Sequence, residues 1–212
     1  MNDETVWLKC YQRIDVKEKC KQNSCIPATI HWLISWNGLI GNSSLGLNLE
    51  NFQIDICNNI PSEKRSFTTI ANYIEDKYGK SNFNFQIENK FETGKEKFER
   101  IFELISNQIG VGISIHSGIR CSKSNRGINL WNSKQNVPYV QNYLRNFFSR
   151  VELSKIIRGW HIIPVVGMSK KKLIIKDLSN GKIKKFSREY LEFLHNHEGL
   201  TGGNDLVWLK ND

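Results

Sequence analysis

The chain has 212 residues, of which 39% are hydrophobic and four are proline. This length and composition are typical of a globular domain with a full core, and they exclude a disordered chain. The sequence has no run of about 18 apolar residues, so it predicts no membrane span. Because the charged start MNDETVWLKCYQRID lacks the apolar core of a secretory signal, we expect a cytoplasmic protein.

The net charge is +9, from 30 Lys and Arg residues against 21 Asp and Glu residues. Such an excess can attract nucleic acid. The basic residues are scattered, however, and residues 90–100 mix Lys with Glu without forming a nucleic-acid motif. A solvated surface is the favoured interpretation, and nucleic acid is not an expected partner.

The first predicted elements are helical. Apolar residues at helical spacing follow Cys25, with Ser24 as the N-cap and Gly38 as the predicted end. A second helix is expected over residues 66–78, and a short alternating strand over residues 82–87.

The middle of the chain changes character twice. Apolar spacing predicts a third helix over residues 98–105, and a strand over residues 111–116 follows it. The polar stretch of residues 117–158 is predicted to be an insertion that contains one helix, over residues 140–148.

The last part of the chain is rich in short β-forming runs, separated by the turn signals SKKK and SNG. Strands are expected over residues 160–166, 173–176, 182–186 and 206–209, with a short helix over residues 190–194. Helices that come first and an antiparallel meander that comes later indicate an α+β fold. No linker divides the chain, so we expect a single domain over residues 1–212.

The five cysteines lie at irregular spacing and form no CxxC pair: Cys10, Cys20, Cys25, Cys57 and Cys121. A structural zinc site is therefore not expected, and in a reducing compartment all five should be free thiols. Cys25 differs from the others because it begins a predicted helix. Unpaired amides at a helix start stabilise a thiolate, so we expect a lowered pKa for this thiol.

A histidine and an aspartate frame the stretch HIIPVVGMSKKKLIIKD, which begins at His161 and ends at Asp177. Taken alone, His161 is a core histidine and Asp177 a turn former. Two antiparallel strands joined by the SKKK turn bring the two residues side by side, however. An acid that holds an imidazole in one tautomer is the arrangement that a general base requires.

These residues resemble a known family. The motif Cys25-Ile26-Pro27-Ala28 at a helix start, followed downstream by His161, Gly167 and Asp177, is similar to papain-like cysteine peptidases. It resembles in particular the double-glycine leader peptidase domain of bacteriocin exporters and its free-standing relatives, whose motif is Cys-Gly-Pro-Ala. The resemblance implies a papain-like fold, with N-terminal helices packed on a C-terminal antiparallel sheet.

The resemblance also implies a reaction. Cys25 would attack a peptide carbonyl and form a thioester that water hydrolyses, with His161 as general base and acid and Asp177 as its orienting group. Family members cleave after small residues such as a glycine pair. Their oxyanion-hole glutamine, six residues before the cysteine, is replaced by Lys19 here, so the candidate donors are Gln22 and the Cys25 backbone amide.

Two other functions remain open. The same three residues can transfer an acyl group to an amine, and the replacement at Lys19 is compatible with an inactive basic binding module. The expected partners are a peptide or protein substrate and a protein partner within a larger system. No cofactor or metal is expected, because His195 and His197 lack a third ligand. Trp131 and Trp160 are candidates for a cleft wall.

Overall fold

The computed structural model describes residues 4–20, 23–40, 51–79, 83–124, 126–131, 135–198, 200 and 205–210. Its helices are α1 (Cys25–Ile40), α2 (Phe52–Asn59), α3 (Phe67–Tyr78), α4 (Gly94–Ser106), α5 (Val137–Phe148) and α6 (Arg188–Asn196). Its strands are β1 (Val6–Trp7), β2 (Phe85–Glu88), β3 (Val111–Cys121), β4 (Gly127–Asn129), β5 (Ile156–Met168), β6 (Lys172–Asp177), β7 (Lys182–Ser187) and β8 (Leu206–Leu209).

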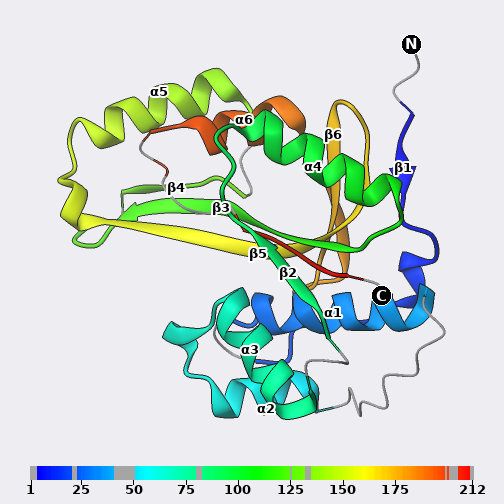
Figure 1. Cartoon of the computed structure of the whole chain (residues 1–212). Coiled ribbons are helices and arrows are strands. Elements are labelled where there is room, and N and C mark those ends of the chain that lie inside the picture. The colour runs from blue at the N-terminus through cyan, green and yellow to red at the C-terminus, as the bar shows by residue number, and fades with distance from the viewer. Residues whose placement is uncertain are drawn as a thin grey trace.

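The strands form one antiparallel sheet in the order β2-β8-β3-β5-β6-β7, with β1 paired to β5 and β4 paired to β3. Helices α1, α2 and α3 lie on one side of this sheet, and α4, α5 and α6 lie on the other (Figure 1). The fold is α+β, as predicted. Within the described ranges, no helix is both long enough and apolar enough to cross a membrane.

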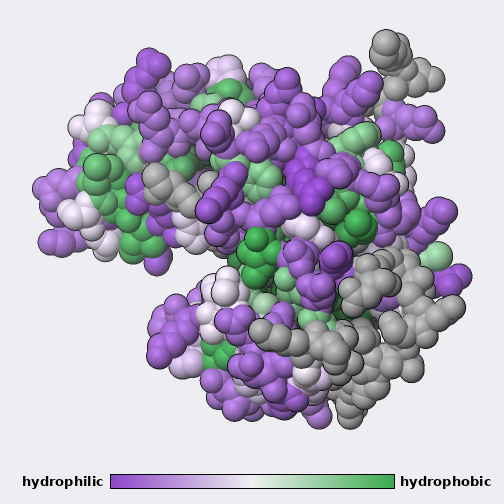
Figure 2. Space-filling view, in the orientation of Figure 1, coloured by the Kyte–Doolittle hydropathy of each residue, from purple (hydrophilic) through white to green (hydrophobic). Residues whose placement is uncertain are grey.

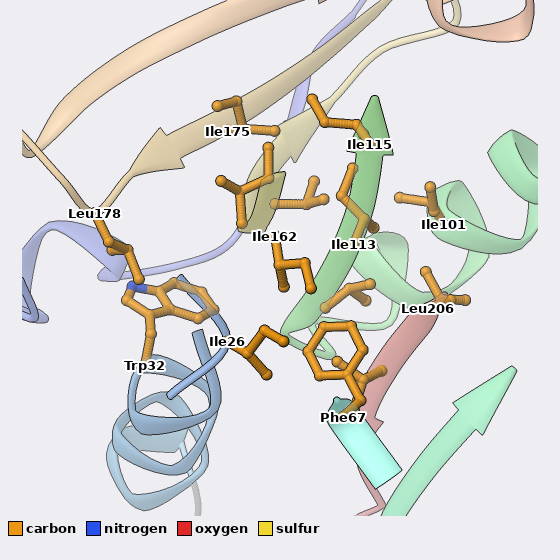
Figure 3. Close-up of a cluster of buried hydrophobic side chains, with 14 of the residues drawn as sticks. Ile26, Trp32, Phe67, Ile101, Ile113, Ile115, Ile162, Ile175, Leu178 and Leu206 are labelled. Carbon is orange, nitrogen blue, oxygen red and sulfur yellow. The ribbon is translucent and has the colours of Figure 1, made fainter. Parts of the chain in front are cut away.

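Helix α1 packs its apolar residues against the centre of the sheet. Ile26 and Trp32 face Ile113 and Ile162 in the core (Figure 3). The helix continues through Gly38 to Ile40, so the predicted end was two residues short. A glycine inside a helix costs about 1 kcal/mol relative to alanine, which burial of a large apolar face outweighs.

Helix α2 was not predicted. It has only eight residues, and its buried side chains include the polar Gln53 beside Phe52 and Ile56, which interrupts an apolar pattern. The next helix, α3, agrees with prediction, because the Ser66 hydroxyl accepts a hydrogen bond from the backbone N–H of Thr69 at its start.

Strands β3 and β5 are longer than predicted. β3 continues past His116, with an irregular register before Gly118, and β5 already begins at Ile156. Together with β4, the added lengths form an extension of the sheet, residues 117–131 and 156–160, which we call the arm. Helix α5 lies along one face of the arm (Figure 1).

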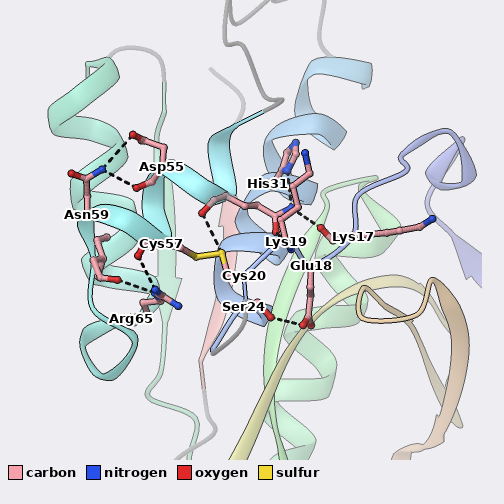
Figure 4. Close-up of a disulfide and its surroundings, with 12 residues drawn as sticks. Lys17, Glu18, Lys19, Cys20, Ser24, His31, Asp55, Cys57, Asn59 and Arg65 are labelled. Atoms are coloured by element: carbon pink, nitrogen blue, oxygen red, sulfur yellow. Dashed lines mark hydrogen bonds between the residues drawn. A yellow bond between two sulfur atoms is a disulfide. The ribbon is translucent and has the colours of Figure 1, made fainter.

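A disulfide joins Cys20, just before α1, to Cys57 of α2 (Figure 4). The expectation of five free thiols is therefore wrong for this pair. The two Cα atoms lie 6.5 Å apart, a separation that a disulfide spans, but the partners are 37 residues apart in sequence and no local pattern links them. Cys10, Cys25 and Cys121 are free.

Loss of this disulfide should destabilise the domain. Closing a loop of this length contributes about 3–4 kcal/mol by restricting the unfolded chain. We therefore expect the double variant Cys20→Ser, Cys57→Ser to lose about that much free energy of unfolding in urea denaturation without reductant. Cys10→Ser is the matched control and should change little. Equal stabilities of the double variant and the control would show that the bond contributes nothing.

Candidate active site

The N-terminus of α1 meets β5 at Ile162. The backbone N–H of Ile162 is in hydrogen-bonding position for the thiol of Cys25, the first residue of the helix. One turn further on, the buried Thr29 hydroxyl donates a hydrogen bond to the carbonyl oxygen of Ile162, at 3.1 Å. Both polar groups of one strand residue thus contact α1, and that residue directly follows His161.

His161 lies beside Asp177, which ends β6. The distance from His161 Nε2 to Asp177 Oδ1 is 3.8 Å, which suits an ion pair and is longer than a hydrogen bond. Because β6 pairs with β5 from Val165 onward, the antiparallel register brings the end of β6 back toward His161. The predicted juxtaposition of the two side chains is therefore present.

Asp177 also organises the turn that follows it. Its carboxylate accepts hydrogen bonds from the N–H and hydroxyl of Ser179, at 3.1 and 2.5 Å, and from the Asn180 side chain at 3.1 Å. The Lys184 amine lies 3.4 Å from Oδ2 of the same carboxylate. Burial raises the pKa of Asp177, but these hydrogen bonds and the charges of His161 and Lys184 hold it below its usual range. The buried carboxylate is ionised.

Trp131 and Trp160 both line the cleft beside His161, as predicted for a cleft wall. Trp131 meets the His161 ring edge-on, with centroids 4.5 Å apart, and the Lys184 amine lies 4.0 Å from the Trp131 ring centre. Trp160 is 37% exposed and packs on buried His116.

Burial decides the charge of the cysteine and the histidine. It raises the pKa of Cys25, and the nearby N–H groups of Ile162, Ile26 and Cys25 itself offset this only in part. The expectation that the helix start lowers this pKa is therefore wrong. Burial also lowers the pKa of His161, although the charges of Asp177 and Glu18 act in the opposite direction. Both groups are neutral near neutral pH.

Glu18 is a site residue that the sequence did not reveal. Its carboxylate raises the pKa values of both Cys25 and His161, and it accepts a hydrogen bond from the Ser24 hydroxyl (Figure 4). Ser24 thus begins α1 through its backbone carbonyl, which accepts from Ala28, rather than through its hydroxyl. A lone glutamate in a loop carries no pattern that would have marked it.

The segment before Cys25 is held by Gln53, which is fully buried. Gln53 accepts a hydrogen bond from the N–H of Lys19 and donates to the carbonyl of Lys17 and to His31 Nδ1. The Lys19 charge acts on His31, whose pKa is lowered to about 4 by burial and then by this lysine. The predicted oxyanion donor Gln22 lies outside the described residues.

A groove of about 520 Å³ opens beside His161. Its lining comes from the arm, from the start of β5 and from the turn after β6. The lining residues are Ser117, Gly118, Ile119, Arg120, Gly127, Ile128, Asn129, Trp131, Ile157, Gly159, Trp160, His161, Asp177 and Ser179. Figure 2 shows the surface hollowed between the arm and the group of helices α1, α2 and α3.

Two of the remaining histidines, His195 and His197, lie at the end of α6. Among the described residues, no three His, Cys, Asp or Glu side chains are grouped to hold a metal ion. His195 and His197 are half-buried, because His195 approaches the carbonyl of Phe91 and His197 packs on Phe148 and Phe193.

The sequence matches no model of a known protein family and no curated protein. The structure is similar to a crystal structure from Bacillus anthracis described as a "putative C39-like peptidase", with a TM-score of 0.54 and 10% sequence identity. The similarity covers 99% of this chain and 99% of that chain. At this identity the likeness shows the fold, which is that of a C39-like peptidase.

The free thiols should react with iodoacetamide in an order set by their surroundings. The hydroxyl of Ser124 and the N–H of Lys123 lower the pKa of Cys121, whereas burial raises that of Cys25. Because the thiolate is the nucleophile, we expect Cys121 to be alkylated ahead of Cys25 below the ordinary thiol pKa of about 8.5. Peptide mass mapping over a pH series measures both rates. Faster labelling of Cys25 would mean that it is already a thiolate in the resting protein.

Proposed function

We propose that the protein is a cysteine peptidase in which Cys25 is the nucleophile, His161 the general base and acid, and Asp177 the orienting group. The observation that carries this proposal is a pair of contacts at neighbouring residues of β5. His161 Nε2 lies 3.8 Å from Asp177 Oδ1, and the backbone N–H of the next residue, Ile162, faces the Cys25 thiol. The C39-like fold supports the same interpretation. The Cys-x-Pro-Ala motif, which resembles that of papain-like cysteine peptidases, supports it as well.

The tautomer of His161 follows from its neighbour. Because Nε2 faces the ionised Asp177, the ring proton resides on Nε2 and the lone pair on Nδ1. Nδ1 is then the nitrogen that accepts the thiol proton. Since burial disfavours both charges in the resting state, the proton moves to His161 as the sulfur attacks the peptide carbonyl.

The reaction then proceeds through two steps. The carbonyl carbon binds Sγ of Cys25, the amide bond breaks, and His161 returns its proton to the leaving amine, which leaves a thioester. Water gives its proton to His161 and attacks the thioester, and the thiol is restored as the acid product leaves. The N–H of Cys25 stabilises the oxyanion in both steps, with Gln22 as the second donor.

The favoured substrate is a peptide cleaved after small residues. This proposal rests on the family resemblance of Cys25, Pro27 and Ala28. Ile26, which stands where the family has glycine, is only 6% exposed and packs in the core (Figure 3), and it is not among the residues that line the groove.

Substitution of the three residues should give unequal losses. Cys25→Ala and His161→Ala should each lower kcat/KM by at least about 10³-fold, and the double variant should be no worse, because members of one catalytic unit are not additive. Asp177→Asn should lose less, since an amide can still orient the ring. Hydrolysis of internally quenched Gly-Gly peptides measures these effects, with circular dichroism as the control for folding.

Three outcomes would redirect the proposal. Retention of most activity in His161→Ala would remove this histidine from the reaction. Formation of an acylated amine in place of the free acid would make the protein an acyltransferase. If the unsubstituted protein cleaved no peptide and binding were unchanged in Cys25→Ala, an inactive binding module would be the better interpretation.

The pH dependence should report the surroundings of His161. The base must be neutral to accept a proton, and burial lowers the pKa of His161, so the acid limb of kcat/KM should lie below about pH 6.5. Asp177→Asn removes a charge that raises this pKa, and it should move the limb to lower pH. Lys184→Met removes a charge that lowers it, and it should move the limb to higher pH. A limb that stays in place in both variants would show that another group is titrating.

A further inference from the structure

On the face of the arm that lines the groove, several positions are glycines, so the bottom of the groove is formed by backbone atoms. Antiparallel residues directly opposite one another share a face of the sheet, so Asn129, Gly118 and Gly159 form one row across β4, β3 and β5. The next row outward contains Gly127, Arg120 and Ile157. The two rows therefore hold three glycines and three side chains.

The strands lie too close together at these glycines for larger residues. A Cβ atom at Gly118 would come within 2.7 Å of the carbonyl oxygen of Ile128, and one at Gly127 within 2.6 Å of that of Ile119. Both contacts are with backbone atoms, which cannot move aside as the end of a flexible side chain can. The missing side chains leave an open trough that runs along the arm and reaches His161.

Arg120 supplies the exposed charge of this trough. Asp177, the other charged residue among the described residues that line the groove, is 2% exposed and is already bound by Lys184, Ser179 and Asn180. A guanidinium presents a planar fork of donors that matches a carboxylate. The groove is therefore suited to a ligand with an acidic group at the position of Arg120.

The spacing fixes where that group must lie. Arg120 is opposite Ile157, which precedes His161 by four residues on β5. An extended chain rises about 3.3 Å per residue, so the two positions are about 13 Å, or four residues, apart. Ile157, opposite Arg120, and Trp160, which precedes His161, also line the groove; they are 40% and 37% exposed and offer an apolar surface.

We infer that the groove binds an extended peptide segment with a carboxylate about four residues from the scissile bond, held by Arg120, and an apolar side chain between. This inference rests on the proposed function for the position of the bond. The carboxylate is supplied by an acidic side chain or by a chain terminus, and the two sources share the same contact with the guanidinium.

Binding to the Cys25→Ala variant tests the groove without cleavage. Fluorescence anisotropy is measured with labelled Gly-Gly peptides that carry Glu, Gln or Lys four residues before or after the glycine pair. A fourth peptide ends at the fourth residue, with a free or an amidated terminus. In one of the two series, substituted either before or after the glycine pair, the Glu peptide should bind about tenfold more tightly than the Gln peptide, and the Lys peptide more weakly still. A free terminus that binds like Glu would identify the terminus as a sufficient source.

Arg120 variants in the Cys25→Ala background assign the effect. Arg120→Gln should reduce the preference for Glu over Gln to less than twofold, and Arg120→Glu should reverse it toward Lys. Arg145→Gln, at an exposed arginine of α5, is the matched control and should leave the preference intact. Equal binding of all peptides, absence of binding, or an equal loss in the control would overturn the inference.

Hydrolysis of the same peptides by the protein with Cys25 intact separates the acidic subsite from the peptidase activity. Cleavage of the Glu, Gln and Lys peptides at equal rates would retain the peptidase and reject the acidic subsite. Binding that depends on Arg120 without any cleavage would retain the subsite and reject the peptidase.

Discussion

The backbone N–H and carbonyl of Ile162 hold the N-terminus of α1 against β5, and the candidate site depends on these contacts. Its N–H approaches the Cys25 thiol and its carbonyl accepts the buried Thr29 hydroxyl, so the strand sets both the height and the rotation of the first helical turn. Because His161 is the preceding residue, the same contacts set the separation of the proposed nucleophile and the proposed base. The sheet thereby positions two residues that are 136 positions apart.

Burial at this junction has a chemical consequence. A helix start and an ionised acid both favour a charged cysteine–histidine pair, but removal from water outweighs them at Cys25 and His161. The Cys25 thiol and the His161 ring are then both uncharged at rest, and in the proposed mechanism the proton moves to His161 during the attack. The groove continues from His161 along the arm, so a bound peptide would lie beside this pair.

The sequence was informative where one local pattern sufficed. The start of α1 at Cys25 and the strands that bring His161 beside Asp177 follow from spacing and turn residues alone. The disulfide from Cys20 to Cys57, the short helix α2 and the role of Glu18 depend on contacts between distant segments, which spacing does not encode. The direction of the Cys25 pKa was missed for the same reason, since burial is a property of the packed chain.

The proposed mechanism requires that Cys25 forms a thioester with the acyl part of its substrate. Rapid acid quenching during the reaction with an activated peptide ester, followed by peptide mass mapping, tests it most directly. We predict that the acyl mass appears on the peptide containing Cys25 within the first turnover and decays as free acid forms. Hydrolysis without an acylated Cys25, or with the acyl group on another residue, would contradict the account.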